Sequence, residues 1–300
     1  MIIQCSYLII DLKLDHNIFV GTYPRALKTN SHGNNLPMQT TGPGLHMDPS
    51  ALDAPKASRK KKKTDALPSL RLAPLQPEFS TDTTQNRTYH ALKMAVLGGV
   101  FYPGTAVTLS KLSEMLGTSE MPVREALKRL TAEGAFEALP NRSARVPVLS
   151  PTVIRQILEL RVELESIAAS QAAEHMSKHH IDQLIALDKA MGDALAAQQL
   201  SRYVTLNMEF HFLIYRVAGN EPLLSLIEAL WLRMSPVIAF SLAAAQDAAT
   251  HFDPVGLAHH GNLIKAFQEG DAAKARQEVR ADLLHPGILA NYQDPLAGIR

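Results

Sequence analysis

The chain has 300 residues and is almost neutral, because 30 Lys and Arg residues against 29 Asp and Glu residues give a formal net charge of +1. Total charge therefore identifies no polyanionic partner, and attraction to nucleic acid has to come from a local patch. The hydrophobic content of 46% excludes a wholly disordered chain, and the length allows two hydrophobic cores. The single cysteine, Cys5, excludes an internal disulfide and a cysteine-ligated zinc module, and it favours a reducing, cytoplasmic setting.

The N-terminal segment has the composition of an extension. Residues 37–83 are rich in Pro, Ser, Thr, Gly and charge, so little apolar surface offsets the entropy of ordering. We expect residues 1–84 to be disordered or to precede the true start, for which Met38 and Met47 are candidates. No uninterrupted apolar stretch reaches the roughly 18 to 20 residues that cross a bilayer, and no export signal is evident, so we expect no membrane association.

Three short helical patterns follow. The first ends at the glycine pair 98–99, and the second, residues 109–116, has its apolar residues on one face. Gly117 suits the left-handed conformation that ends many helices, and the third helix begins after Thr118 and Ser119, whose hydroxyls suit N-capping. The sequence thus predicts a tight turn between the second and third helices.

The third helix has an apolar face and a basic face. Val123, Leu127 and Leu130 face inward, whereas Arg124 and Lys128 stand four residues apart on the outer face. A basic outer face after a tight turn is typical of a DNA recognition helix. An ordinary solvated helix face has the same spacing, so on spacing alone both interpretations stay open.

Two short strand patterns come next. FEAL and ARVPV flank the polar turn 140–143 and predict a β-hairpin. Three helices followed by a hairpin are the elements of a winged helix-turn-helix, whose third helix enters the major groove. Residues 85–148 hold eight Lys and Arg residues against five Asp and Glu residues, a local charge of +3. We therefore predict a DNA-binding winged domain at residues 85–149.

The segment LSKLSEMLGTSEMPVREALKRLTAEGAFEALPNRSARV resembles the DNA-binding domain of the GntR family of bacterial transcription regulators. The resemblance implies that Arg124 contacts DNA and that the wing at Arg142 and Ser143 approaches the minor groove. The predicted DNA-binding residues are Thr118, Ser119, Glu120, Arg124, Lys128, Arg142 and Ser143. Two positions depart from the family pattern. Glu120 replaces the usual Arg, and a carboxylate repels phosphate but accepts a hydrogen bond from cytosine. Ser143 replaces a Gly of the wing turn.

Beyond residue 150 every pattern is helical, with short breaks that favour an antiparallel bundle. The predicted helices cover about residues 151–177, 179–198, 201–217, 221–247, 254–269 and 272–284. The predicted fold is therefore mainly α, an N-terminal winged helix-turn-helix with three helices and a β-hairpin followed by an antiparallel all-α helical bundle.

Four polar residues of the bundle are candidate metal ligands. Asn207 and His211 are four apart and project from one side of a helix, while His260 and Asp282 lie on two successive helices that an antiparallel turn brings together. Isolated helical histidines are more often structural. His259 cannot face inward together with His260, because adjacent helical residues diverge by about 100°.

The C-terminal part, from about residue 154 to 285, resembles the FCD ligand-binding domain of the FadR-type branch of this family. The segments RVELESIAASQAA, FHFLIYRVAGN and HGNLIKAFQEGDAAKA carry the resemblance. It implies an effector-binding and dimerisation domain at residues 150–292, with 293–300 as a tail, and a divalent metal held by one Asp and three His beside a carboxylate effector. Those four positions fall on Asn207, His211, His260 and Asp282. Two of them differ from the family, because Asn207 stands at the position of the Asp and Asp282 at the position of the last His. Zn, Ni or Mn remains compatible with this donor set, and His285 is an alternative ligand.

Arg161 and Glu165 are spaced as a helical ion pair, and Arg233 lies in an otherwise apolar helix. An ordinary salt bridge and a snorkelling arginine explain both. A buried arginine also suits a planar carboxylate, so Arg161 and Arg233 are candidate effector contacts.

The sequence thus favours a ligand-responsive, DNA-binding transcription regulator and not an enzyme. We expect it to bind a double-stranded operator as a homodimer and to respond to a small carboxylate effector. A metal-dependent helical-bundle enzyme is the first alternative, although no nucleophile, phosphate-loop or dinucleotide motif is evident. A metal-independent architectural DNA-binding protein is the second. Neither the operator nor the effector follows from the sequence.

Overall fold

The computed structural model describes residues 83–140, 143–247, 255–284 and 292. The expectations for residues 1–82 and for the tail 293–300 lie outside the described residues, as do those for Arg142 and His285.

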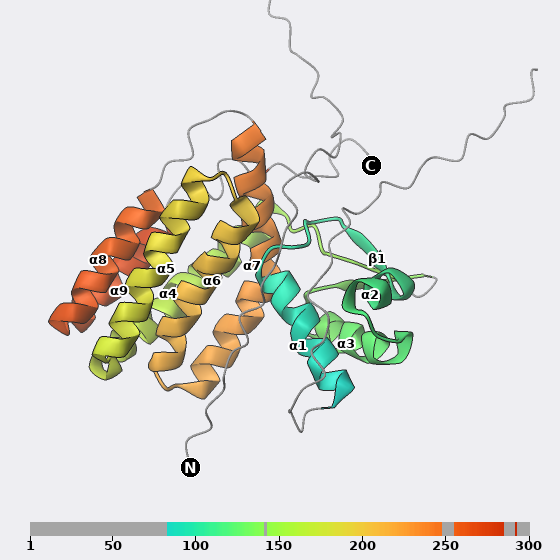
Figure 1. Ribbon diagram of the computed structural model, residues 1–300, viewed down its shortest axis with the longest axis horizontal. Helices are drawn as coiled ribbons and strands as arrows, with labels where there is room; N and C mark the ends of the chain where they lie inside the picture. The colour runs from blue at the N-terminus through green and yellow to red at the C-terminus, as the bar shows by residue number, and fades with distance from the viewer. Residues whose placement is uncertain (1–82, 141–142, 248–254, 285–291, 293–300) are drawn as a thin grey trace, which may run out of the picture. The chain divides into compact units, whose positions relative to one another are not determined.

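The N-terminal domain consists of three helices and a small sheet (Figure 1). The helices are α1 (Thr84–Leu97), α2 (Leu109–Leu116) and α3 (Glu120–Ala132), and the strands are β1 (Ala106–Thr108), β2 (Glu137–Leu139) and β3 (Ser143–Arg145). The predicted hairpin is present as β2 and β3. The prediction of two strands was incomplete, however, because β1 pairs antiparallel with β3 and makes a three-stranded sheet of order β1-β3-β2. With three residues, β1 is too short to show an alternating pattern.

Local sequence explains the turn between α2 and α3. The Thr108 hydroxyl accepts a hydrogen bond from the backbone N–H of Lys111 at the start of α2, and Gly117 adopts a φ of 62° at its end. Ser119 occupies the N-cap of α3, but its side chain makes no capping hydrogen bond, contrary to our expectation. Glu120 instead places a negative charge in the first turn, where the helix dipole favours it.

The winged domain packs around a small apolar core. Leu92, Leu112, Val123 and Leu130 are fully buried, and α1 packs against α3. As predicted, the apolar face of α3 lies in this core, which leaves its basic face outside.

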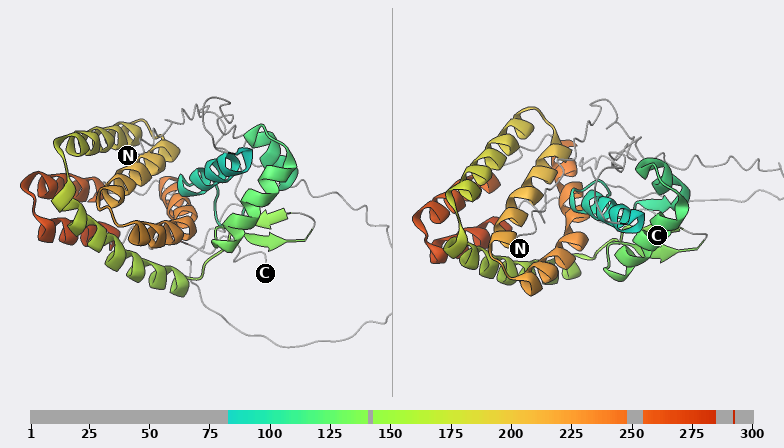
Figure 2. Two further views of the ribbon diagram at one scale, coloured as in Figure 1. Left: turned by 90° about the horizontal axis from the view of Figure 1, so that it is seen from below. Right: turned by 60° about the horizontal axis from the view of Figure 1, so that its bottom comes forward.

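The C-terminal domain is a bundle of α-helices (Figures 1 and 2). They are α4 (Pro151–His175), α5 (Lys178–Ala196), α6 (Leu200–Val217), α7 (Glu221–Asp247), α8 (Val255–Glu269) and α9 (Ala272–Leu283). Each lies within three residues of its predicted bounds. Helix α4 packs against α6, α7 and α9, while α5 packs against α6 and α8, so polar residues from several helices meet inside the bundle.

Helix α7 contains the one segment of the described chain, Glu221–Ala244, that is long and apolar enough to cross a membrane. Half of this segment is buried inside the bundle, where Met234 and Val237 pack against Ile154 and Ile157 of α4. A core helix of a bundle passes the same test of length and composition, so this helix is weak evidence for a membrane span.

Candidate functional site

The outer face of α3 presents its charged residues to solvent. Arg124 and Lys128 are exposed, and Glu120 and Met121 are exposed at the N-terminal end of the same helix. Side chains at this end of a recognition helix are those that contact base edges. Of the predicted residues in the preceding turn, Thr118 is partly buried and Ser119 is exposed.

Ser143 stands in the wing turn at the position where the family usually has glycine. Ser143 is the first residue of β3, and its hydroxyl donates a 2.6 Å hydrogen bond to the carbonyl oxygen of Pro140. Among the described non-glycine residues only Gln198 has a positive φ, so position 143 does not require the left-handed conformation that favours glycine. The hydrogen bond closes the turn in a different way.

Inside the bundle, three of the four predicted metal ligands come together. One ligand atom each from His211 on α6, His260 on α8 and Asp282 on α9 lies within 4.8 Å of the others. We call these three residues the His–Asp cluster. The Asp282 carboxylate is 3.4 Å from Nε2 of His211 and 4.0 Å from Nε2 of His260. Both histidines are buried, and the Asp282 side chain is 14% exposed.

Aromatic neighbours fix the two rings. The His260 ring stacks on Phe210 with their centroids 4.4 Å apart, and the His211 ring lies 5.7 Å from the ring of Trp231. The ring nitrogens of His260 are buried and have no hydrogen-bond partner within the described part of the chain. Buried imidazole nitrogens that lack partners are costly unless a proton donor, an acceptor or a cation satisfies them.

The predictions for His259 and Asn207 have different outcomes. Nδ1 of His259 is 3.0 Å from Glu278, outside the His–Asp cluster, which confirms that His259 and His260 do not both face inward. Asn207 is half-buried on α6, one turn before His211 and on the same side of the helix. Its role as a ligand stays a prediction.

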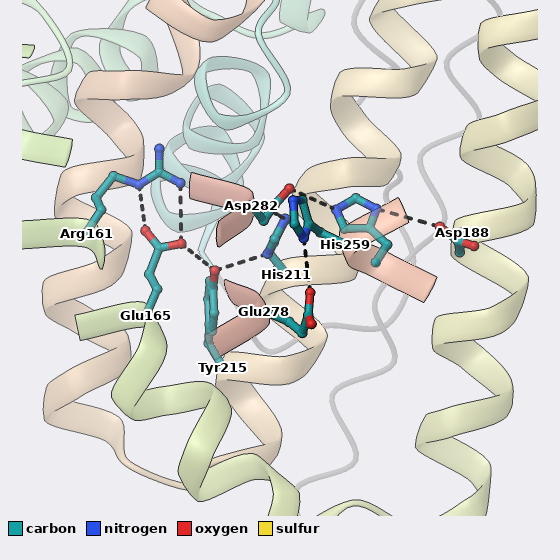
Figure 3. A network of polar contacts seen from close by, with 9 residues as sticks. Arg161, Glu165, Asp188, His211, Tyr215, His259, Glu278 and Asp282 are labelled. Carbon is teal, nitrogen blue, oxygen red and sulfur yellow. Dashed lines mark hydrogen bonds and ion pairs between the residues drawn. The ribbon is translucent and has the colours of Figure 1, made fainter. Parts of the chain in front are cut away.

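A chain of hydrogen bonds leads from α4 to His211 (Figure 3). Nε of Arg161 donates to Glu165 at 2.5 Å, and Nη2 donates to the second carboxylate oxygen at 3.3 Å. That second oxygen also accepts a hydrogen bond from the hydroxyl of Tyr215. The same hydroxyl oxygen is 3.2 Å from Nδ1 of His211. We call Arg161, Glu165 and Tyr215 the polar relay. All three are buried, so the relay is shielded from water.

A further carboxylate near the cluster, Asp188 on α5, was not among the predicted site residues. Its Oδ1 atom is buried without a hydrogen-bond partner in the described structure and lies 3.6 Å from Nδ1 of His260. Figure 3 shows Asp188 on the side of the cluster opposite to the polar relay. The sequence did contain a signal for this residue. Asp188 comes four residues after Leu184 and three before Met191, and both of these side chains are fully buried. A carboxylate therefore occupies the apolar face of α5, where such a group is unusual.

The charges in the site influence one another. Burial tends to raise the pKa of Asp282, but the hydrogen bond to His211 and positive charge on the neighbouring histidines outweigh it and leave that pKa below its ordinary value. A divalent cation in the same place would act in the same direction. Burial, together with the charges of Asp282 and Asp188, raises the pKa of Tyr203, so this phenol stays protonated.

Comparisons with known proteins agree with this architecture. Residues 84–146 match the family of bacterial regulatory proteins called gntR, and residues 156–285 match the FCD domain. The HTH-type transcriptional regulator McbR of Escherichia coli K12 is 30% identical over 204 residues, which are 67% of this chain and 90% of McbR. The protein belongs to the GntR family of transcription regulators and carries an FCD domain.

Solved structures of GntR regulators share the fold. That of E. coli McbR has a TM-score of 0.64 at 25% identity and covers 70% of this chain and 98% of its own. A GntR-type regulator from Rhodococcus sp. RHA1 has a TM-score of 0.56 at 19% identity, covers 70% of this chain and 99% of its own, and supports the fold alone.

Membership of the GntR family decides between the alternatives. Its relatives and family matches are transcription regulators, so this GntR protein is a DNA-binding transcription regulator and not an enzyme. The metal-dependent enzyme is therefore not supported. The predicted effector contact Arg233 is half-buried on α7, and the position that a Cβ would take at Gly134, after α3, lies 3.6 Å from its Cδ. The structure thus places Arg233 toward the winged domain, and its effector role stays a prediction.

Proposed function

We propose that this GntR regulator binds its operator as a homodimer in the cytoplasm and that its bundle holds a divalent cation which helps to bind a small carboxylate effector. The observation that carries the proposal is the convergence of three ligand atoms, from three different helices, within 4.8 Å inside the bundle. An operator with twofold symmetry presents two half-sites in neighbouring major grooves, and a dimer supplies the two matching recognition helices.

The donor atoms fit a divalent ion. Two ligand atoms that each lie about 2.1 Å from a tetrahedral ion are about 3.4 Å apart, and Nε2 of His211 is 3.4 Å from Oδ2 of Asp282. The distance between Nε2 of His260 and Oδ1 of Asp282 is larger, 4.0 Å, so His260 would move slightly inward when the ion binds. Two imidazoles and one carboxylate suit a borderline cation such as Zn, Ni or Mn. Asn207 would add a neutral oxygen from the preceding turn of α6. When bound, such an ion supplies the positive charge that attracts a carboxylate ligand.

In the part of the chain that the structure describes, Arg161 has a free donor nitrogen that can bind an acceptor group of the effector. Its guanidinium lies over the Trp231 ring, 4.4 Å from the centroid, and two of its nitrogens are bonded to Glu165. The third, Nη1, is buried and has no hydrogen-bond partner among the described residues. Because Glu165 already balances its charge, Arg161 would contribute a hydrogen bond to the effector, and the ion would contribute the charge.

Helix α7 provides a route from the bundle to the DNA-binding domain. Both domains belong to one compact unit, and α7 carries Trp231 beside the polar relay and also packs against α1 of the winged domain. Nζ of Lys93 on α1 lies 2.6 Å from Glu228 on α7. A ligand that binds one position of α7 better than another would thereby change the population of DNA-binding conformations.

The test measures metal content and thermal unfolding of the full chain. We expect about one divalent ion per chain, a lower melting temperature after chelation, and no chelator effect in His211→Ala, because an ion that binds only the assembled site stabilises the folded state. His259→Ala is the matched control and should keep the ion, since His259 pairs with Glu278. Asn207→Asp should tighten binding by adding a carboxylate.

A protein without metal, without a chelator effect and without a gain in Asn207→Asp would overturn the metal proposal. Titration of small carboxylates against the operator complex then decides between an effector-responsive regulator and the metal-independent architectural protein, because only the regulator changes its DNA affinity.

A further inference from the structure

The hydroxyl of Tyr215 contacts both the Glu165 carboxylate and the His211 ring. A phenol has one proton, and Tyr215 donates it to the Glu165 carboxylate, which cannot donate one in return. The 3.2 Å contact between the Tyr215 oxygen and Nδ1 of His211 then requires a hydrogen on Nδ1.

A neutral His211 with its hydrogen on Nδ1 has its lone pair on Nε2. This atom is the one that faces Asp282, at 3.4 Å. A lone pair and a carboxylate oxygen repel each other at this distance, unless a second proton on Nε2 makes the hydrogen bond to Asp282 described above, or a cation lies between the two atoms. The polar relay therefore prepares His211 as an acceptor at the atom that faces the cluster.

His260 lies between two carboxylates and has no hydrogen bond to either of them in the described structure. Its Nδ1 is 3.6 Å from the buried Oδ1 of Asp188, and its Nε2 is 4.0 Å from Asp282 on the other side of the ring. Stacking on Phe210 fixes the plane of the ring. Asp188 is the nearer of the two carboxylates, and a carboxylate beside one nitrogen of a metal-binding histidine favours a hydrogen on that nitrogen and leaves the other nitrogen as the ligand.

We propose that Tyr215 and Asp188 are positioning residues that hold His211 and His260 with hydrogens on Nδ1, so that both present Nε2 to the ion. This inference rests on the proposed metal site, and it assigns roles to Tyr215 and Asp188, which are not ligands in that site. Arg161 and Glu165 act one step further away, because Glu165 remains an acceptor for Tyr215 while Arg161 balances its charge.

The first measurement needs no metal. In the metal-free protein labelled with ¹⁵N-histidine, long-range proton–nitrogen spectra at alkaline pH distinguish the two tautomers, and His211→Ala and His260→Ala assign the signals. We expect the hydrogen on Nδ1 for both residues. In Tyr215→Phe, His211 should lose this preference while His260 keeps it, and in Asp188→Ala the reverse should hold.

The second measurement is the affinity for Zn²⁺ by competition with a chelator. We expect a loss of about 10- to 100-fold in Tyr215→Phe and in Asp188→Ala. Asp188→Asn keeps an acceptor oxygen and should recover part of the loss. Asp182→Ala, at an exposed position of α5, and Tyr89→Phe, in the winged domain, are the matched controls and should bind as the wild type does.

The outcomes separate this inference from the proposed function. Wild-type protein that binds no Zn²⁺ overturns the metal proposal. The tautomers measured in the metal-free protein then still show whether Tyr215 and Asp188 hold the two histidine rings as inferred. Hydrogens on Nε2 in the metal-free protein overturn the positioning roles, as does unchanged Zn²⁺ affinity in both variants. Melting curves of the metal-free variants show whether a loss of affinity comes from a loss of folded protein.

Discussion

The winged domain and the bundle use polar residues in opposite ways. On α3 the charged side chains of Arg124, Lys128 and Glu120 are exposed on an apolar framework, and each can be replaced without leaving a partner buried. In the bundle, Arg161 and Glu165 are 1% and 0% exposed and depend on each other. A single substitution on the exposed face of α3 therefore tests DNA recognition, whereas a substitution in the bundle first changes the stability of the fold.

The largest effect that this comparison predicts is on the stability of the bundle. Glu165→Ala leaves the buried guanidinium of Arg161 without its counter-ion and removes the acceptor of Tyr215, so the free energy of unfolding should fall by about 3 to 5 kcal/mol. Chemical denaturation of the metal-free protein measures this change. The exposed pair of Lys178 and Asp182 on α5 is the matched control, because both pairs are spaced four residues apart on a helix.

In the control, Asp182→Ala should cost less than about 1 kcal/mol, since exposed ion pairs contribute little. Equal losses in the two variants would contradict the view that burial makes the polar relay indispensable to the fold.

The next effect concerns DNA. Arg124→Ala should weaken operator binding by about 1 to 3 kcal/mol and relax discrimination between operator and unrelated DNA, because a bidentate base contact carries that much specificity. Fluorescence anisotropy with both duplexes measures the two affinities. Arg155→Ala, which removes an exposed arginine at the start of α4, should leave both unchanged. A folded Arg124→Ala protein with wild-type affinity and specificity would show that α3 does not read bases through this residue.

Periodicity predicted the fold well because the helices are long and amphipathic. The breaks at 219–220 and 270–271 gave the ends of α6 and α8, where Gly219 and Gly270 adopt positive φ. Strand β1 escaped detection because its three residues pair only with the distant β3. A strand of this length is defined by its partner rather than by its own sequence.

The candidate site was predictable only in part, for a related reason. His211 was found from helical spacing, and His260 and Asp282 from an antiparallel turn together with the family resemblance. The role of Asp188 depends on its distance from a histidine of another helix, and the order of donors in the polar relay depends on Tyr215 meeting Glu165 from α4. Residue spacing within one helix carries no information about such contacts between helices.

The smallest predicted effect is at Glu120, where this protein departs from its family. Glu120→Arg replaces a carboxylate that repels phosphate with a cation at the exposed start of α3. If the new arginine reaches a phosphate, one more counterion is released, and the plot of log affinity against log salt concentration should steepen by about 0.9. The change should also weaken α3 slightly, because the helix dipole favours a negative charge in the first turn.

The control is Glu159→Arg, which makes the same change of charge at an exposed position of α4 and should leave the slope unchanged. An unchanged slope in Glu120→Arg as well would place residue 120 away from the DNA backbone.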